Sequence, residues 1–235
     1  MVSRLLRFLQ VQLAPLSMRE RMVSALGGFV AILAVFAVST RIAGDHAAMM
    51  VVASAGASAV LVFAVPHGPL SQPWPLVGGH VISALIGVAC ARLVPDIALA
   101  AALAVGLSIG AMHLAHCIHP PGGATALTAV VGGPAIASMG YWYAVTPVLT
   151  NMLILVAVGV VFNRPFRWRR YPAAGALADL PRPEALTSYG DITHADFVAA
   201  LAQMDSFIDV SEQDLVRLYE LVTENSNQRH LRESA

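Results

Sequence analysis

The near absence of charge over residues 22–163 constrains this chain more than any other feature. The four charged residues in that region are Arg41, Asp45, Arg92 and Asp96. They leave charge-free runs at 22–40, 46–91 and 97–163. One bilayer crossing takes about 20 apolar residues, so these runs have room for about one, two and three crossings. The chain is 12% charged, roughly half the share of soluble domains. We therefore predict an all-α polytopic membrane protein with about six hydrophobic elements.

Arginines flank this apolar region on both sides. Four precede it and four follow it: Arg4, Arg7, Arg19, Arg21, Arg164, Arg167, Arg169 and Arg170. By the positive-inside rule both ends face the cytoplasm, which requires an even number of crossings. We expect an integral membrane protein, in the inner membrane of a bacterium, with both termini cytoplasmic. Six spans and four spans with two re-entrant segments both satisfy this count.

Three segments flank the transmembrane domain at 22–163. Residues 1–21 are expected to form an amphipathic segment at the membrane interface. Residues 164–189 are interpreted as a linker. Residues 190–235 are predicted to be a cytoplasmic tail of two short helices, which is too small to hold a hydrophobic core alone. We expect the tail to pack on itself, on a second copy of the chain, or on a domain that this sequence does not contain.

The transmembrane domain contains a weak internal repeat. A shift of 67 positions aligns residues 34–60 with 101–127 and gives nine identities, of which five are alanine pairs. The informative part pairs "GASA" at 56–59 with "GATA" at 123–126. If the repeat is real, units at about 22–93 and 97–163 each hold three elements. Units with an odd number of crossings insert in opposite orientations, as in many transporters.

The second unit contains a break, "HCIHPPGGATALTAVVGGP" at 116–134. Pro120 and Pro121 cannot continue a helix, and Gly122 and Gly123 allow unusual dihedrals and close backbone approach. We predict that a half-helix begins there inside the membrane with unpaired amides. A helix start carries partial positive charge and several donors, which suits an anion.

The equivalent stretch of the first unit, Gly56 to Ser58, is predicted to be a second such helix start facing the first. Together the two starts would form a small, neutral pocket near the bilayer midplane that holds a monovalent anion weakly. His80 and Asn151 could add polar lining, although hydrogen bonding between helices is the ordinary role of such residues. The predicted substrate-binding residues are Gly56, Ala57, Ser58, His80, His119, Gly122, Gly123, Ala124, Thr125 and Asn151.

Three histidines, His113, His116 and His119, recur every third residue around Cys117. Imidazole and thiolate are good metal ligands, but the same spacing also occurs in residues with structural hydrogen bonds. A proton or anion role for His119 is a third interpretation, because histidine titrates near neutral pH. We predict no metal site, no cofactor and no catalytic residue.

The stretches "HPPGGATAL" (119–127) and "QPWPLVGGHVISALIGV" (72–88) resemble the HPP family of integral membrane proteins, named for its His-Pro-Pro signature. The likeness covers about residues 20–165. Plastid and cyanobacterial members are implicated in nitrite transport, so the resemblance implies a transporter or channel for a small anion. Some bacterial members continue into nucleotide-sensing modules, for which this sequence gives no support.

Our leading hypothesis is therefore a transporter or channel for a small inorganic anion, nitrite or nitrate. The alternative is a membrane-anchored sensor whose tail relays to a partner or to a missing nucleotide-sensing domain. An enzyme is not expected, because no H-E-x-x-H and no intramembrane carboxylate occurs. Besides the anion and the lipid bilayer, we expect a homo-oligomer, preferably a dimer, and no nucleic-acid partner.

Overall fold

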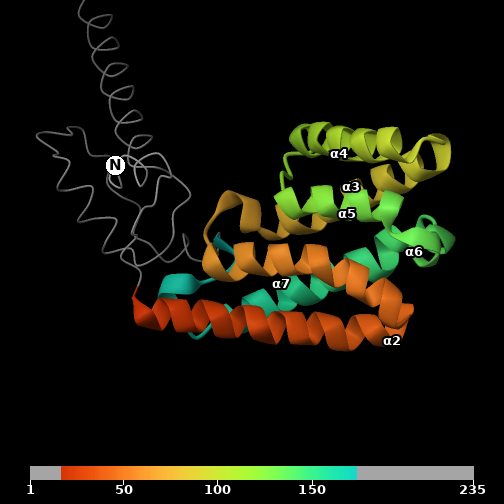
Figure 1. Cartoon of the computed structure of the whole chain (residues 1–235). Helices are drawn as coiled ribbons and strands as arrows, with labels where there is room; N and C mark the ends of the chain where they lie inside the picture. Colours follow the sequence, from red (N-terminus) through yellow and green to blue (C-terminus); the bar gives the residue numbers. More distant parts are fainter. Residues whose placement is uncertain (1–16, 174–235) are drawn as a thin grey trace, which may run out of the picture. The chain divides into compact units, whose positions relative to one another are not determined.

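The computed structural model describes residues 17–173, without the side chains of residues 43–52. Over this range the chain consists of helices and short connections, which confirms the all-α prediction (Figure 1). The elements are α2 (Met18–Ala64), η1 (Pro69–Ser71), α3 (Pro73–Leu93), α4 (Ile97–Leu114), α5 (Pro120–Val131), α6 (Gly133–Met139), η2 (Ala144–Leu149), α7 (Thr150–Asn163) and η3 (Arg167–Arg169).

Four helices of the described part are long and apolar enough to cross a membrane. They are Met18–Ile42 within α2, α3, α4 and Ala144–Asn163, which joins η2 to α7. Two shorter pieces complete the set: Ala53–Ala64, and the pair α5 and α6, which is bent by 99°. This confirms a polytopic membrane protein.

Helix α2 folds back on itself. Residues 27 and 63 of a straight helix would lie about 54 Å apart, at about 1.5 Å of rise per residue. Yet a Cβ atom added to Gly27 would lie 2.3 Å from Cδ1 of Phe63. We call Met18–Ile42 the first arm and Ala53–Ala64 the second arm. Figure 1 shows them side by side in red and orange.

The helices begin where side chains satisfy or remove the first backbone donors. The Ser17 hydroxyl accepts a hydrogen bond from the Glu20 amide at 3.1 Å and starts α2. Asp96 accepts one from the Leu99 amide at 2.7 Å and starts α4. Helices α3 and α5 begin with prolines, which have no amide hydrogen to leave unpaired.

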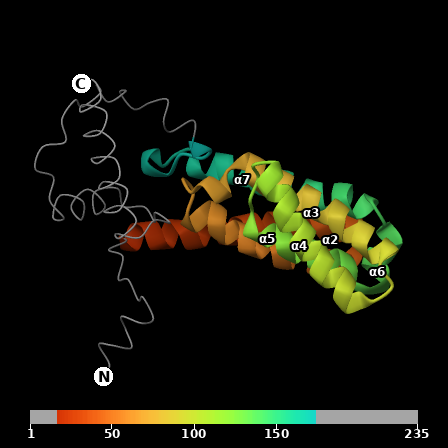
Figure 2. The same ribbon diagram turned by 90° about the horizontal axis from the view of Figure 1, so that it is seen from above.

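Two layers of packing hold the membrane body together. The two arms of α2 pack against α7 around a core of Ala31, Val35, Ala55, Ala59, Val62, Phe63, Leu76, Met152, Leu155 and Tyr171. Helices α3, α4 and α5 pack against one another, as both views show (Figures 1 and 2). Large apolar side chains such as Phe29 and Leu114 remain 65% and 85% exposed, which suits a surface solvated by lipid.

Both ends of the described chain lie on the same side of this body. Glu20, in the first turn of α2, contacts Trp168 and Arg169 of η3. An even number of crossings requires this arrangement. The predicted segment at 1–21 lies outside the described residues as far as residue 16. The predicted linker beyond residue 173 and the tail at 190–235 also lie outside them.

Candidate functional site

Four polar side chains meet in the apolar interior of the membrane body. Ser58 comes from the second arm of α2, His80 from α3, His119 from the N-cap of α5, and Thr125 from within α5. Each is 0% exposed. A buried polar group costs free energy unless it is hydrogen-bonded. The cost of burying these four side chains therefore depends on the hydrogen bonds that they make.

The four side chains bond one another in series. The Ser58 hydroxyl lies 2.8 Å from Nε2 of His80 and 2.8 Å from Nε2 of His119. Nδ1 of His80 lies 2.6 Å from the Thr125 hydroxyl. Nδ1 of His119 lies 2.8 Å from the carbonyl oxygen of Leu70, in η1. Both nitrogens of both imidazoles therefore have a partner, and we call these four residues the histidine cluster.

A sharp reversal of the chain brings His119 into the cluster. Helix α4 ends at Leu114, and His116 adopts a positive φ of 52°. The Cys117 amide then bonds the Met112 carbonyl at 2.9 Å. His119 itself has an extended backbone, with φ −143° and ψ 103°. The residue before a proline is pushed into such a conformation, so Pro120 helps to set the direction in which His119 points.

Glycines let α3 and α5 approach closely beside the histidine cluster. A Cβ atom on Gly79 would lie 2.7 Å from Cβ of His119. One on Gly122 would lie 2.9 Å from the Gly79 carbonyl oxygen and 2.9 Å from the Ser83 hydroxyl. The sequence analysis places Gly122 and Gly123 in a pocket between two helix starts. The structure corrects this for Gly122, which serves close helix packing.

The predicted helix start at Gly56, Ala57 and Ser58 is also wrong. These residues lie well inside α2, which is helical from Met18 to Ala64. Their amides are therefore interior helix amides that bond within the helix. Of the two predicted half-helix starts, only the one at α5 remains. Residues 56–58 contribute the hydroxyl of Ser58 to the histidine cluster.

The remaining helix start, at α5, offers fewer free amides than predicted. Its first two residues, Pro120 and Pro121, have no amide hydrogen. The Gly122 amide bonds the His119 carbonyl at 2.8 Å. The Pro-Pro-Gly sequence thus starts a helix in an apolar environment with little donor capacity left over. The donors of the site are side chains, not the backbone dipoles that we expected.

The other predicted site residues lie outside the histidine cluster. Ala57 and Ala124 are exposed, and Gly56 and Gly123 are partly exposed. Asn151 is buried, but its Oδ1 accepts a hydrogen bond from Ser39 at 2.5 Å, and its Nδ2 has no partner. The structure brings together Ser58, His80, His119 and Thr125 of the predicted set.

The histidine cluster lies on one side of the middle of α3. Ser58 precedes the end of α2 by six residues, about 9 Å of helix. His80 follows the start of α3 by seven residues, about 10 Å of a helix about 31 Å long. His80 thus lies about 4.5 Å from the middle of α3, on the side of the end that holds Glu20 and Arg169.

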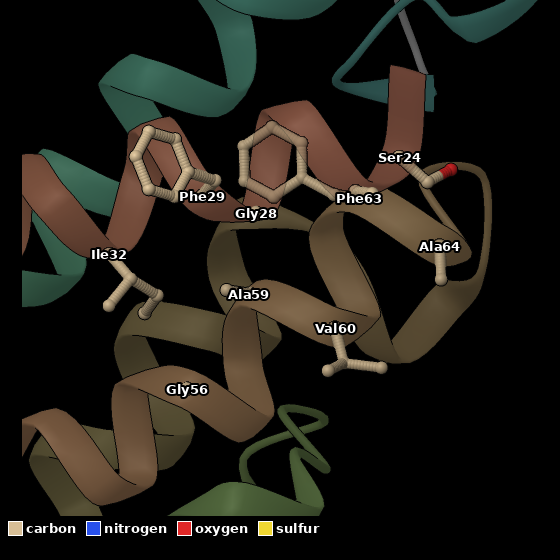
Figure 3. Close-up of a pocket in the computed structure, with 10 residues that line it drawn as sticks. Ser24, Gly28, Phe29, Ile32, Gly56, Ala59, Val60, Phe63 and Ala64 are labelled. Carbon is tan, nitrogen blue, oxygen red and sulfur yellow. The ribbon is translucent and has the colours of Figure 1, made fainter. Parts of the chain in front are cut away.

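An open groove lies elsewhere, between the two arms of α2 (Figure 3). It has a volume of about 400 Å³ and is largely apolar. Its lining comprises Ser24, Ala25, Gly28, Phe29, Ile32, Gly56, Ala59, Val60, Phe63 and Ala64. Of the predicted site residues, Gly56 alone lines it. A groove of this chemistry suits an apolar occupant and not an inorganic anion.

His113, His116 and His119 do not meet at one site. His113 and His116 are exposed, whereas His119 is buried. Among the side chains described at residues 17–42 and 53–173, no three from His, Cys, Asp or Glu are placed to hold a metal ion. Both cysteines, Cys90 and Cys117, are buried free thiols.

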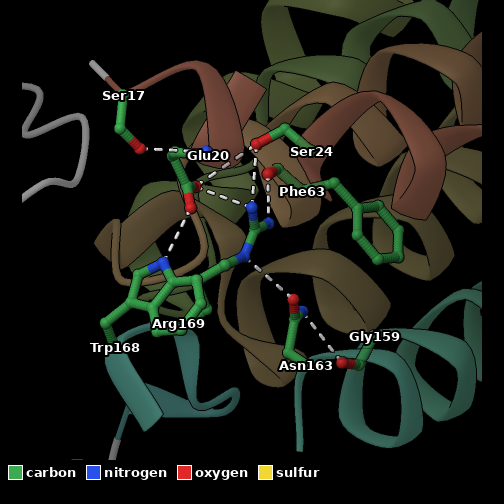
Figure 4. Close-up of polar contacts among 8 residues, drawn as sticks. All are labelled: Ser17, Glu20, Ser24, Phe63, Gly159, Asn163, Trp168 and Arg169. Carbon is green, nitrogen blue, oxygen red and sulfur yellow. Dashed lines mark hydrogen bonds and ion pairs between the residues drawn. The ribbon is translucent and has the colours of Figure 1, made fainter. Parts of the chain in front are cut away.

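The sequence analysis missed a buried ion pair at the ends of the described chain (Figure 4). Nη1 of Arg169 lies 2.6 Å from Oε1 of Glu20, and the two side chains are 1% and 4% exposed. Arg169 also donates to the Phe63 carbonyl, Ser24 and Asn163, and Trp168 donates to Glu20 at 2.8 Å. Burial lowers the pKa of Arg169 below its usual value, and Glu20 opposes that shift. We call this group the terminal clasp.

One sequence signal could have found the terminal clasp. Glu20 is the only acidic residue among the first 44, and it stands directly before a span. An isolated acid beside a membrane helix calls for a partner, since a buried charge persists only when it is paired. The sequence analysis uses all eight flanking arginines as indicators of membrane orientation. In the structure, Arg169 is instead buried and bonds Glu20 and the Phe63 carbonyl.

Comparison with known proteins places these features in a family context. The family described as HPP, transmembrane region, matches residues 13–172, nearly the range that the structure describes. Two relatives from Dictyostelium discoideum, each named as a transmembrane protein, are 38% and 37% identical over 151 and 153 residues. Each alignment covers 63% of this chain, and 53% and 49% of the relatives, so the chain spans about half their length. No solved structure matches the chain.

Proposed function

The chain belongs to the HPP transmembrane region family, and on that premise we propose that it is a transporter or channel for a small inorganic anion. Nitrite is the first candidate and nitrate the second. The sequence resemblance supports this choice, because related plastid and cyanobacterial proteins are implicated in nitrite transport. The membrane body supplies the spanning helices that such a protein needs.

The observation that carries the proposal is the histidine cluster. Two hydroxyls and two imidazoles lie buried in the membrane body and bond one another. The hydroxyls and the imidazole N–H groups are the donors that an anion oxygen could accept from in exchange for their present bonds. The cluster includes no arginine, so it would hold a monovalent anion weakly enough to release it, as permeation requires.

The same contacts indicate how an anion would enter. Ser58 and Thr125 now bond His80, and Ser58 also bonds His119. An anion would exchange these bonds for bonds to its own oxygens, so the second arm of α2 and α5 must separate locally. These two elements are the moving parts of the proposed mechanism.

Nitrite uptake into proteoliposomes that contain the full chain tests the proposal. We expect uptake well above that of empty liposomes, which serve as the baseline because undissociated nitrous acid crosses bilayers unaided. His119→Gln should reduce uptake about tenfold or more. His113→Gln is the matched control, since His113 is exposed, and it should keep the original rate.

Two outcomes would overturn the proposal at different levels. Wild-type uptake equal to the baseline for both nitrite and nitrate would reject transport. That result, together with loss of a cellular phenotype on deletion of residues 190–235, would favour the membrane-anchored sensor. Equal uptake by the His119 and His113 variants would keep transport and reject the histidine cluster as its site.

Orientation and assembly complete the proposal. We propose a bacterial inner-membrane protein with both termini in the cytoplasm, because arginines flank both ends of the membrane body. We also propose a homodimer. Labelling of single cysteines placed near each terminus in intact cells checks the first point. Light scattering of the purified protein checks the second.

A further inference from the structure

The carbonyl of Leu70 fixes the protonation pattern of the histidine cluster. A carbonyl oxygen only accepts hydrogen bonds, so Nδ1 of His119 must carry a hydrogen to make its 2.8 Å contact with Leu70. In neutral His119, Nε2 is then an acceptor. Its partner is the Ser58 hydroxyl, which must donate.

This pattern extends through the whole cluster. Ser58 has one hydrogen, which it gives to His119, so it accepts from Nε2 of His80. Nδ1 of His80 then accepts from the Thr125 hydroxyl. The result is one directed series from Thr125 through His80, Ser58 and His119 to the Leu70 carbonyl. All four side chains are neutral in this state, and both imidazoles are fully paired.

A second acceptor near Ser58 provides another state. The Ser58 hydroxyl lies 3.2 Å from the carbonyl oxygen of Ser54, one turn earlier in α2. If its hydrogen turns to that carbonyl, both lone pairs of the hydroxyl are free to accept. His80 and His119 can then both donate from Nε2. His119 carries a hydrogen on each nitrogen and is a cation, yet no group has lost its partner.

We propose that the histidine cluster binds one proton, taken from the aqueous phase, on Nε2 of His119, with the Ser58 hydroxyl as the switch between the two states. The proposal extends to coupling, which rests on the proposed function: the proton and the anion occupy the site together. The charge of protonated His119 offsets that of the anion. This pairing matters because an unpaired charge is costly in an apolar interior, and the chain has no lysine.

The contacts favour His119 over His80 as the proton site. A proton on Nδ1 of His80 would turn the Thr125 hydroxyl into an acceptor, and the described contacts give its hydrogen no second acceptor. The two imidazole centroids are 5.0 Å apart, so repulsion between two cations limits the cluster to one proton.

The surroundings of His119 are neutral on every side that the described contacts show. The second arm of α2 presents Ser58, α3 presents His80, and η1 presents the Leu70 carbonyl. The Tyr143 hydroxyl donates to the Thr125 carbonyl at 3.2 Å. The contacts within the cluster involve no charged side chain that would compete for the proton.

Nitrogen NMR of the histidine-labelled protein in lipid nanodiscs tests the proton site directly. At high pH we expect opposite tautomers: a hydrogen on Nδ1 of His119 and on Nε2 of His80. On acidification His119 should gain its second hydrogen while His80 stays neutral. The same tautomer in both rings, or a hydrogen on Nε2 of His119 at high pH, would overturn the proposal, as would titration of His80 first.

Two variants test the switch. Ser58→Ala removes it and should lower the proton affinity of His119 about tenfold or more, because the second hydrogen of the ring then has no acceptor. Thr40→Ala is the matched control, since the Thr40 hydroxyl also bonds the carbonyl one turn earlier, at 3.1 Å, but outside the cluster. An equal proton affinity of His119 in both variants would reject the switch.

Flux measurements separate this proposal from the proposed function. A pH dye inside proteoliposomes should report about one proton entering with each nitrite, above the baseline of empty liposomes. Nitrite uptake without proton entry would reject coupling and keep transport. The expected tautomers and titration without any uptake would reject transport and keep the proton site.

Discussion

The second arm of α2 and helix α5 have the same pattern of buried and exposed positions, but their starts and their ends differ. At the 67-residue shift, residues 53–62 and 120–129 have the same degree of burial at all ten positions. Ser58 and Thr125 are equivalent under this shift, and they bond opposite nitrogens of His80. The agreement supports the predicted duplication, which stays a prediction. It shows how a repeated helix face places one hydroxyl on each side of a single imidazole.

The starts of the two helices create the difference that matters for chemistry. The second arm continues a longer helix, whereas α5 begins at Pro120 after the extended His119. The position equivalent to His119 is Val52. The proline break therefore adds a second imidazole on one side only, and the histidine cluster becomes asymmetric.

The ends differ as well. At the end of α2, Arg169 donates to the Phe63 carbonyl. At the end of α5, Gly132 leads directly into α6, and a Cβ atom there would lie 2.5 Å from the Thr128 carbonyl oxygen. One end is held by a side chain from a distant part of the sequence, and the other by local backbone geometry. Substitutions can test each of these contrasts.

The largest effect should come from the end of α2. Arg169→Ala leaves Glu20 buried without its partner, and losing one member of such a pair costs about 3–5 kcal/mol. We expect a large fall in the melting temperature of the detergent-purified protein. Arg167→Ala is the control, since Arg167 is exposed. Equal melting temperatures for the two variants would show that the terminal clasp contributes nothing to stability.

The next effect should come from the face of α5. Position 55 of the second arm is alanine, whereas its counterpart is Gly122. Gly122→Ala would push a methyl group against the Gly79 backbone, and overpacking of this kind costs about 1–3 kcal/mol. Thermal unfolding should show the loss. A stable Gly122→Ala protein would mean that α3 and α5 have room to separate, contrary to the close approach described here.

The third effect is a difference in stability between two variants, each of which removes one hydroxyl of the histidine cluster. Ser58→Ala leaves two imidazole nitrogens without partners, whereas Thr125→Val leaves one. Each unsatisfied buried group costs about 1–3 kcal/mol. Chemical denaturation in mixed micelles should therefore rank Ser58→Ala as the more destabilised. The reverse ranking would contradict the central position of Ser58 in the series.

The smallest effect should be shared by both helices. A Cβ atom on Gly56 meets nothing within 4 Å, and one on Gly123 comes no closer than 3.9 Å to Val105. Alanine at either position should raise stability by up to about 1 kcal/mol, through the higher helix propensity of alanine. Melting temperatures that move in opposite directions would break the comparison between the two helices.

The sequence predicted the membrane body well because its elements follow from runs of apolar residues. The expected unit boundaries at about 93 and 97 coincide with the end of α3 and the start of α4. The error at Gly56 has a simple cause. Glycine alone does not end a helix, and no proline stands beside it as Pro121 stands beside Gly122.

The site was predicted in part. Ser58, His80, His119 and Thr125 were identified because polar residues are conspicuous in an apolar chain. Their bonds to one another depend on how three helices pack, which local patterns do not specify. The ion pair between Glu20 and Arg169 joins residues 149 positions apart, so neither flank alone could reveal it.

The terminal clasp has a mechanical consequence. Arg169 grips the first turn of α2 through Glu20 and the last turn of α2 through Phe63. Phe63 stands five residues beyond Ser58 on the same helix. A force applied to the polypeptide after Arg170 would thus be transmitted to both ends of α2. Residues 58–63 of α2 would transmit it further, to the Ser58 hydroxyl that joins the two imidazoles.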